Sequence, residues 1–127
     1  MSWSKSILLG YDYEAIEILL PIHAVDDPKI LDCTYNTGKM WKKSKYKPTR
    51  MDIDSSLDLD VVGDFTKMPF NNESFDVIVF DPPHLPIAAA SKNSSRIWEK
   101  SYGITNNRSK GDNINSIFLP FLSEALR

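Results

Sequence analysis

Apolar residues occur in short runs separated by polar turns, a pattern typical of alternating strands and helices. In residues 13–20, Ile16, Leu19 and Leu20 share one helical face, which predicts a helix that Pro21 ends. Four short apolar runs, each bounded by turn-forming residues, predict strands. They cover residues 29–35, 49–53, 59–65 and 75–81.

The segments after these runs differ in character. Asn36-Thr37-Gly38 predicts a turn, because Asn and Gly tolerate positive φ, and a short helical segment is expected around 39–43. Residues 84–113 are rich in Ser, Asn, Lys and Gly and lack periodicity, which predicts a long mobile loop. Apolar residues recur at helical spacing over 114–126 and predict an amphipathic helix, in which Pro120 either makes a kink or opens a second segment.

This alternation predicts an α/β fold with a doubly wound, mostly parallel sheet. Ligands of such sheets bind outside the carboxyl ends of the strands. The residues that close each predicted strand are therefore the candidates for a functional site.

Composition limits the class of protein further. The chain has 127 residues, of which 42% are hydrophobic and 25% are charged, which predicts a single globular domain. No apolar run is long enough to span a membrane, so a cytoplasmic protein is expected. The single cysteine excludes a cysteine-based zinc site, and no metal is expected. The net charge of -2 limits any polyanion contact to a local patch. Residues 39–50 carry six Lys or Arg and no acid, which suits either a phosphate contact or a solvated basic face.

Each of the four predicted strands has an aspartate at or near its carboxyl end. The first ends at Asp32, before a small polar loop that lets backbone approach a ligand closely. Asp52 follows twenty positions later, the spacing at which nucleoside-binding folds place an acid on the ribose hydroxyls, although surface strands also often end in aspartate. Asp64 precedes Phe65, a pair suited to an adenine amino group and its ring or simply to a turn.

The fourth predicted strand ends in Asp81-Pro82-Pro83-His84. Two consecutive prolines fix φ and remove two N–H donors, so a carboxylate and carbonyls form a rigid set of acceptors beside an aromatic ring. This set suits a flat group that carries an NH₂, such as a nucleobase. The alternative is a plain proline turn.

Four segments in this order resemble the class I S-adenosylmethionine-dependent methyltransferases: ILDCTYNTG, MDID, VVGDFTKMPF and SFDVIVFDPPH. Asp-Pro-Pro followed by an aromatic residue resembles the motif of methyltransferases that modify adenine N6 or cytosine N4. The similarity is greatest to phage and bacterial site-specific DNA methyltransferases, such as those of restriction-modification systems, and covers about residues 13–127.

The resemblance implies a Rossmann-like fold, S-adenosylmethionine as cofactor and nucleic acid, DNA rather than RNA, as partner. It assigns Asp52 to the ribose, Asp64 and Phe65 to the adenine of the cofactor, and Asp81 to both the cofactor site and catalysis. The family has seven strands and only four are recognisable, so the chain is expected to be a partial domain completed by a further segment or a partner chain. The loop around the methionine part of the cofactor would comprise Asp32, Thr34, Tyr35, Asn36 and Gly38; the catalytic motif would comprise Asp81, Pro82, Pro83 and His84.

Two other classes of function stay open. One is a module that binds S-adenosylmethionine or nucleic acid without turnover, or half of a split methyltransferase. The other, a nicotinamide-dependent oxidoreductase, is disfavoured because the first loop lacks G-x-G-x-x-G.

Overall fold

The computed structural model describes residues 10–82 and 114–127, the latter with side chains from Phe118 onward. The elements in chain order are α1 (Asp12–His23), β1 (Ile30–Asp32), the 3₁₀ turn η1 (Lys39–Trp41), β2 (Thr49–Asp52), β3 (Val61–Val62), β4 (Val77–Val79) and α3 (Ile114–Ala125).

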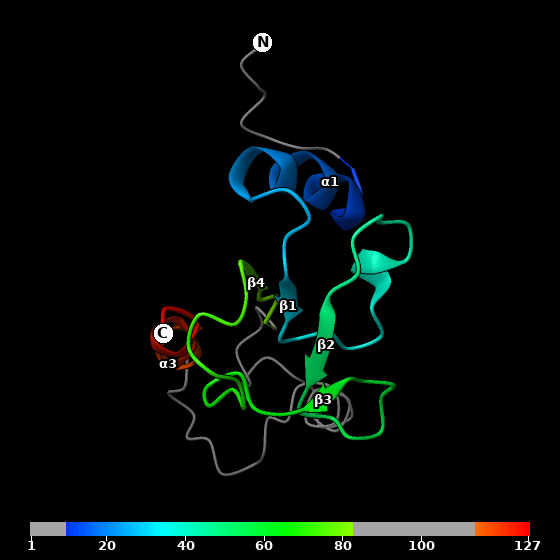
Figure 1. Cartoon of the computed structure of the whole chain (residues 1–127). Helices are drawn as coiled ribbons and strands as arrows, with labels where there is room; N and C mark the ends of the chain where they lie inside the picture. Colours follow the sequence, from blue (N-terminus) through cyan, green and yellow to red (C-terminus); the bar gives the residue numbers. More distant parts are fainter. Residues whose placement is uncertain (1–9, 83–113) are drawn as a thin grey trace.

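The four strands form one parallel sheet in the order β3-β2-β1-β4 (Figure 1). Leu31 of β1 lies opposite Thr49 on one side and Ile78 on the other. The chain thus adds β2 and β3 on one side of β1 and then returns to add β4 on the other side. The predicted α/β fold with a parallel sheet is confirmed, and this strand order is consistent with a Rossmann-like fold.

Three strands are shorter than predicted, and after two of them an aspartate side chain takes up a backbone N–H group. Asp32 Oδ1 accepts the Thr34 N–H at 3.0 Å, and Asp64 Oδ1 accepts the Thr66 N–H at 2.7 Å. Each such turn competes with the ladder for the donor and bends the chain out of the sheet. The strands expected over 29–35 and 59–65 are therefore only three and two residues long, and the strand expected over 75–81 has three residues.

The prediction that Pro21 ends the first helix is wrong. Helix α1 continues to His23, and the Ala24 N–H still bonds to the Leu20 carbonyl at 2.9 Å. Pro21 has no N–H group, so the helix lacks one backbone hydrogen bond at this position. Leu20, one residue earlier, is buried, and the packing of the helix outweighs that loss. The helical segment expected around 39–43 is a single 3₁₀ turn, η1.

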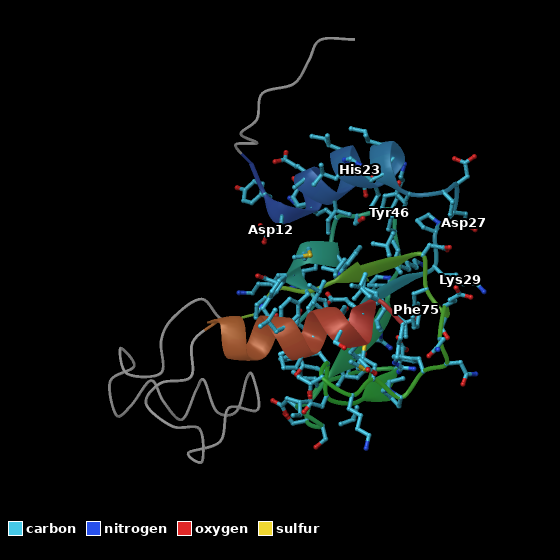
Figure 2. The ribbon with its side chains drawn as sticks, turned by 90° about the vertical axis from the view of Figure 1, so that its left-hand side faces the viewer. Asp12, His23, Asp27, Lys29, Tyr46 and Phe75 are labelled. Atoms are coloured by element: carbon cyan, nitrogen blue, oxygen red, sulfur yellow. The ribbon has the colours of Figure 1, made fainter. Side chains whose placement is uncertain are left out.

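Side chains on the two faces of the sheet join two separate apolar clusters. Leu31 and Met51 pack with Phe121 of α3, whereas Ile30 packs with Leu20 of α1. Ile30 and Leu31 are adjacent in β1, so they point to opposite faces. Figure 2 shows α3 lying across the strands and α1 separate from it beyond η1.

Helix α3 confirms the amphipathic helix expected at 114–126. It contains Pro120 within one helix rather than two segments. Pro120 is exposed and Phe121 is buried, so the apolar face survives the proline. The loop expected at 84–113 lies outside the described residues. Within 10–82 and 114–127, no helix is long and apolar enough to cross a membrane.

Candidate functional site

A pocket of about 370 Å³ lies at the carboxyl ends of β1 and β4. Most of its wall is the loop after β1, with Asp12 added from the first turn of α1 and Asp81 from the segment after β4. Figure 2 shows Asp12 at one end of α1 and His23 at the other. This is the point where the strand order reverses, the usual place for a ligand in such sheets. The pocket is lined by Asp12, Asp32, Thr34, Tyr35, Asn36, Thr37, Gly38, Lys39, Met40 and Asp81.

The loop after β1 is held in shape by two residues with positive φ. Asn36 has φ 50° and Gly38 has φ 66°, as the sequence predicted for this turn. A Cβ at Gly38 would collide with the Tyr35 ring, so only glycine fits beneath this side chain. The Asp52 carboxylate, at the end of β2, accepts the Asn36 N–H at 2.8 Å and anchors the turn.

Asp32 is buried and accepts several hydrogen bonds within the loop. Its Oδ2 accepts from Trp41 Nε1 at 2.6 Å, and its Oδ1 accepts from the backbone N–H and the hydroxyl of Thr34. Burial raises the pKa of the Asp32 carboxyl, and these hydrogen bonds partly oppose that shift. Asp32 therefore organises the loop from below and contributes only a small exposed surface to the pocket.

Asp81 is exposed and lies two residues beyond β4. Its N–H donates to Thr34 Oγ1 at 2.8 Å, while the Cys33 N–H donates to the Val79 carbonyl at 3.2 Å. Hydrogen bonds thus join the two chain segments beyond the last ladder pair. The Asp81 side chain lines the pocket, and its carboxylate has no hydrogen-bond partner among the described residues.

The structure brings six of the predicted cofactor residues to this pocket: Asp32, Thr34, Tyr35, Asn36, Gly38 and Asp81. Asp52 lies behind the loop, buried, with its second oxygen accepting the Asp54 N–H at 3.1 Å. Asp64 and Phe65 do not line the pocket. Asp64 accepts the Thr66 N–H and hydroxyl, and the Phe65 ring meets Phe80 edge-on with 5.0 Å between centroids. Pro82 is buried directly after Asp81, and Pro83 and His84 lie outside the described residues.

Sequence reasoning missed the contributions of Asp12 and Trp41. Asp12 reaches the pocket through the packing of α1 against η1, a nonlocal contact that leaves no local signal. The burial of Trp41 could have been predicted, because it is a large apolar residue within a lysine-rich segment and indole side chains are usually well buried.

The charges around the pocket are mainly acidic. Asp12, Asp32 and Asp81 contribute carboxylates, and Lys39 contributes one ammonium group. Such a wall suits a ligand that carries positive charge. No cluster of His, Cys, Asp or Glu that could hold a metal ion is present in the described part of the chain.

The basic segment 39–50 is less free than its composition suggests. Arg50 donates to Asp58 and Asp60 at 2.9 Å each, and these hydrogen bonds, chiefly that to Asp60, raise the pKa of its guanidinium. Lys45 lies 3.9 Å from Glu17, and Lys43 lies over the Tyr13 ring. The structure therefore removes Arg50 from the set of side chains available to phosphate.

Comparisons of the chain with protein families, with curated proteins and with solved structures found no significant match.

Proposed function

We propose that this protein is an S-adenosylmethionine-dependent methyltransferase that modifies the exocyclic amino group of a nucleic-acid base, adenine N6 or cytosine N4. The observation that carries the proposal is the pocket between β1 and β4, in which Asp81 of the Asp-Pro-Pro motif meets the loop after β1. The motif and the loop are 43 residues or more apart in sequence, yet a direct hydrogen bond joins them. This juxtaposition is what a reaction between a bound cofactor and a target amino group requires.

The size and the charge of the pocket support this proposal. Its volume of about 370 Å³ lies within the range of small-molecule sites. Its carboxylates, Asp12 and Asp81 above all, suit a ligand with an ammonium and a sulfonium group. The turn at Asn36 and Gly38 lets the ligand approach the backbone closely.

The assignment of the nucleoside part of the cofactor to Asp52, Asp64 and Phe65 rests on the sequence resemblance. Asp52 is buried and both of its carboxylate oxygens accept backbone N–H groups, so its observed part in the site is to fix the turn at Asn36. The Phe65 ring packs in the core near α3, so a contact with the adenine needs a rearrangement of that ring.

The chemistry asks the protein to activate a weak nucleophile. The lone pair of an aromatic amino group is delocalised into the ring, and S-adenosylmethionine supplies an electrophilic methyl group when bound. The Asp81 carboxylate and the Pro82 carbonyl would accept hydrogen bonds from the two N–H groups of the target, which localises the lone pair and aims it. As the N–CH₃ bond forms, the S–CH₃ bond would break to leave a thioether, and the proton that the nitrogen loses would pass to water. Positioning and electrostatics account for the rate. A base in a duplex must leave the stack to reach this site.

The test is transfer of labelled methyl groups from S-adenosylmethionine to DNA and to RNA, followed by analysis of the nucleosides. We expect N6-methyladenine or N4-methylcytosine. The D81A variant should lower transfer by about 100-fold or more, since a preorganised acceptor is lost, while binding of S-adenosylmethionine survives in calorimetry, because Asp12 and the loop after β1 still line the pocket. Alanine keeps the backbone N–H that bonds to Thr34, so the variant isolates the carboxylate.

The matched control is D26A, which removes an exposed aspartate from the connection between α1 and β1. It should keep the wild-type rate. Wild-type protein that binds no S-adenosylmethionine contradicts the proposal, and binding without transfer to either nucleic acid indicates a binding module instead. Unchanged transfer by D81A removes Asp81 from the catalytic role.

A further inference from the structure

A chain of hydrogen bonds runs from the buried core to the mouth of the pocket. Trp41 Nε1 donates to Asp32 Oδ2 at 2.6 Å, and the Thr34 N–H and hydroxyl donate to Asp32 Oδ1 at 3.0 and 3.4 Å. The Asp81 N–H then donates to Thr34 Oγ1 at 2.8 Å. Four residues from three segments are linked in this order.

The direction of each bond is set by the chemistry of the groups. An ionised carboxylate only accepts hydrogen bonds, and an indole N–H only donates them. Asp32 is therefore the acceptor in each of these hydrogen bonds, and Trp41 and Thr34 are the donors. A hydroxyl has one proton, and Thr34 directs it toward Asp32. A lone pair of Thr34 Oγ1 is thereby left facing the Asp81 N–H, which has no other bond among the described residues.

The inner part of this chain is rigid. Asp32 is 3% exposed and Trp41 is 7% exposed, packed with Leu20 and Ile30. Leaving a buried carboxylate oxygen without a donor is costly, so the Asp32–Trp41 pair is held in one arrangement. Asp81 is less constrained than this buried pair, because it is exposed and lies beyond the last paired residues of the sheet, Asp32 and Val79.

We propose that Thr34 is a positioning residue for Asp81, and that Asp32 and Trp41 hold Thr34 in place for this task. The proposal rests on the function proposed above, in which Asp81 accepts the target amino group. The family resemblance does not give Asp32 and Thr34 this role. In the proposal they fix the backbone N–H of Asp81 and thereby the position of its carboxylate. It also assigns a role in the site to Trp41.

The first test measures the geometry without any ligand, by amide hydrogen exchange of the full chain in NMR. The T34V variant keeps the shape of the side chain and removes the acceptor, so the Asp81 amide should exchange about 3- to 10-fold faster than in the wild type. T34S keeps the hydroxyl and should restore the protection. The matched control is T37V, on the same loop, whose hydroxyl has no hydrogen-bond partner in the described residues; it should leave the Asp81 amide unchanged.

The second test separates cofactor binding from turnover. T34V should lower kcat by about tenfold or more, because a displaced carboxylate no longer aims the target nitrogen, with the Kd for S-adenosylmethionine within about twofold of the wild type. T34S should recover most of kcat. The W41F variant should accelerate Asp81 amide exchange as well, since it releases Asp32 and, through it, Thr34.

Each result decides one claim. Equal Asp81 exchange in T34V and T34S overturns the positioning role, as does equal kcat in an active enzyme. A Kd that rises in T34V in proportion to the loss of kcat overturns it too, and returns Thr34 to direct cofactor binding. Absence of methyl transfer in the wild type refutes the proposed function instead, and the exchange measurement shows independently whether Thr34 fixes Asp81.

Discussion

Trp41 and Asp32 show how a single pair of side chains can organise a site from behind its wall. The indole packs against Leu20 and Ile30, and its one polar atom finds the carboxylate at 2.6 Å. From the sequence, Asp32 is recognisable as a residue that closes a strand, but a carboxylate that binds a ligand and one that anchors a turn look the same there. Only the packing of Trp41, nine residues later, separates the two roles.

Replacing Trp41 with phenylalanine keeps most of the packing and removes the donor. We expect W41F to lower the free energy of unfolding by about 1–3 kcal/mol, measured by urea titration, because Asp32 Oδ2 is left buried without that bond. The pKa of Asp32 should also rise further, since the Trp41 bond holds it down. Y46F, in the same apolar cluster, removes a hydroxyl that has no hydrogen-bond partner within the described residues. It should change stability by less than about 0.5 kcal/mol, and a similar value for W41F would contradict the argument.

Helix α3 depends on a stack of aromatic rings against the sheet. Phe121 stacks on Phe80 with 3.8 Å between ring centroids and an interplanar angle of 11°, and Phe65 meets both rings edge-on. Phe80 follows β4 directly and precedes Asp81, so the helix is packed against the segment that leads into the Asp-Pro-Pro sequence.

Phe121 is the most buried residue of α3 from Phe118 onward, so truncating it removes packing between the helix and the sheet. We expect F121A to lower the free energy of unfolding by about 3–5 kcal/mol, because the residue is 7% exposed and fills the space between three elements. L119A, two positions earlier and 63% exposed, should change it by less than about 0.5 kcal/mol. Thermal or urea unfolding of the two variants gives the comparison, and equal losses would show that the helix face is assigned incorrectly.

For helices and strands, the sequence predicted the presence of each element better than the residue at which it ends. Within residues 10–82 and 114–127, hydrophobic periodicity located the four strands and two α-helices that the structure describes, since it follows directly from which face is buried. Their ends depend on local competition, such as an Asp64 carboxylate that takes a backbone N–H, or a buried Leu20 that carries the helix past Pro21. The loop after β1 was predicted well, because Asn36 and Gly38 report their own backbone conformation.

Considered as a whole, the described chain is held by contacts between segments far apart in sequence. The guanidinium of Arg127 donates to the Met68 carbonyl at 2.7 Å and to Glu124 Oε1 at 2.6 Å, and that carboxylate accepts the Met68 N–H. The end of α3 is thereby tied to the segment between β3 and β4. Such pairings were beyond prediction from sequence, because nothing local to Met68 indicates a partner 56 residues away.

The hydrogen-bonded contact of Glu124 with Arg127 and Met68 makes the free energy of unfolding depend on pH. The hydrogen bond from Arg127 holds the pKa of Glu124 below its ordinary value of 4.5, so its contribution is present above that value and is lost as the pH falls through the lowered pKa. We expect E124Q to be less stable than the wild type at pH 7, and the difference to shrink as the pH is lowered below 4.5. Urea unfolding at a series of pH values measures this. A difference that stays constant with pH would mean that the charge of Glu124 is not what stabilises the contact.

Cys33 offers a way to observe the site in motion. It is the only thiol in the chain, it is 1% exposed, and its Sγ–H points to the Val79 carbonyl between the loop after β1 and the end of β4. Burial raises its pKa to about 12, so the closed form presents almost no thiolate to an alkylating reagent. Labelling of this sulfur therefore requires the two segments to separate, and its kinetics count the openings of the junction between the loop after β1 and the segment that carries Asp81, with no probe introduced.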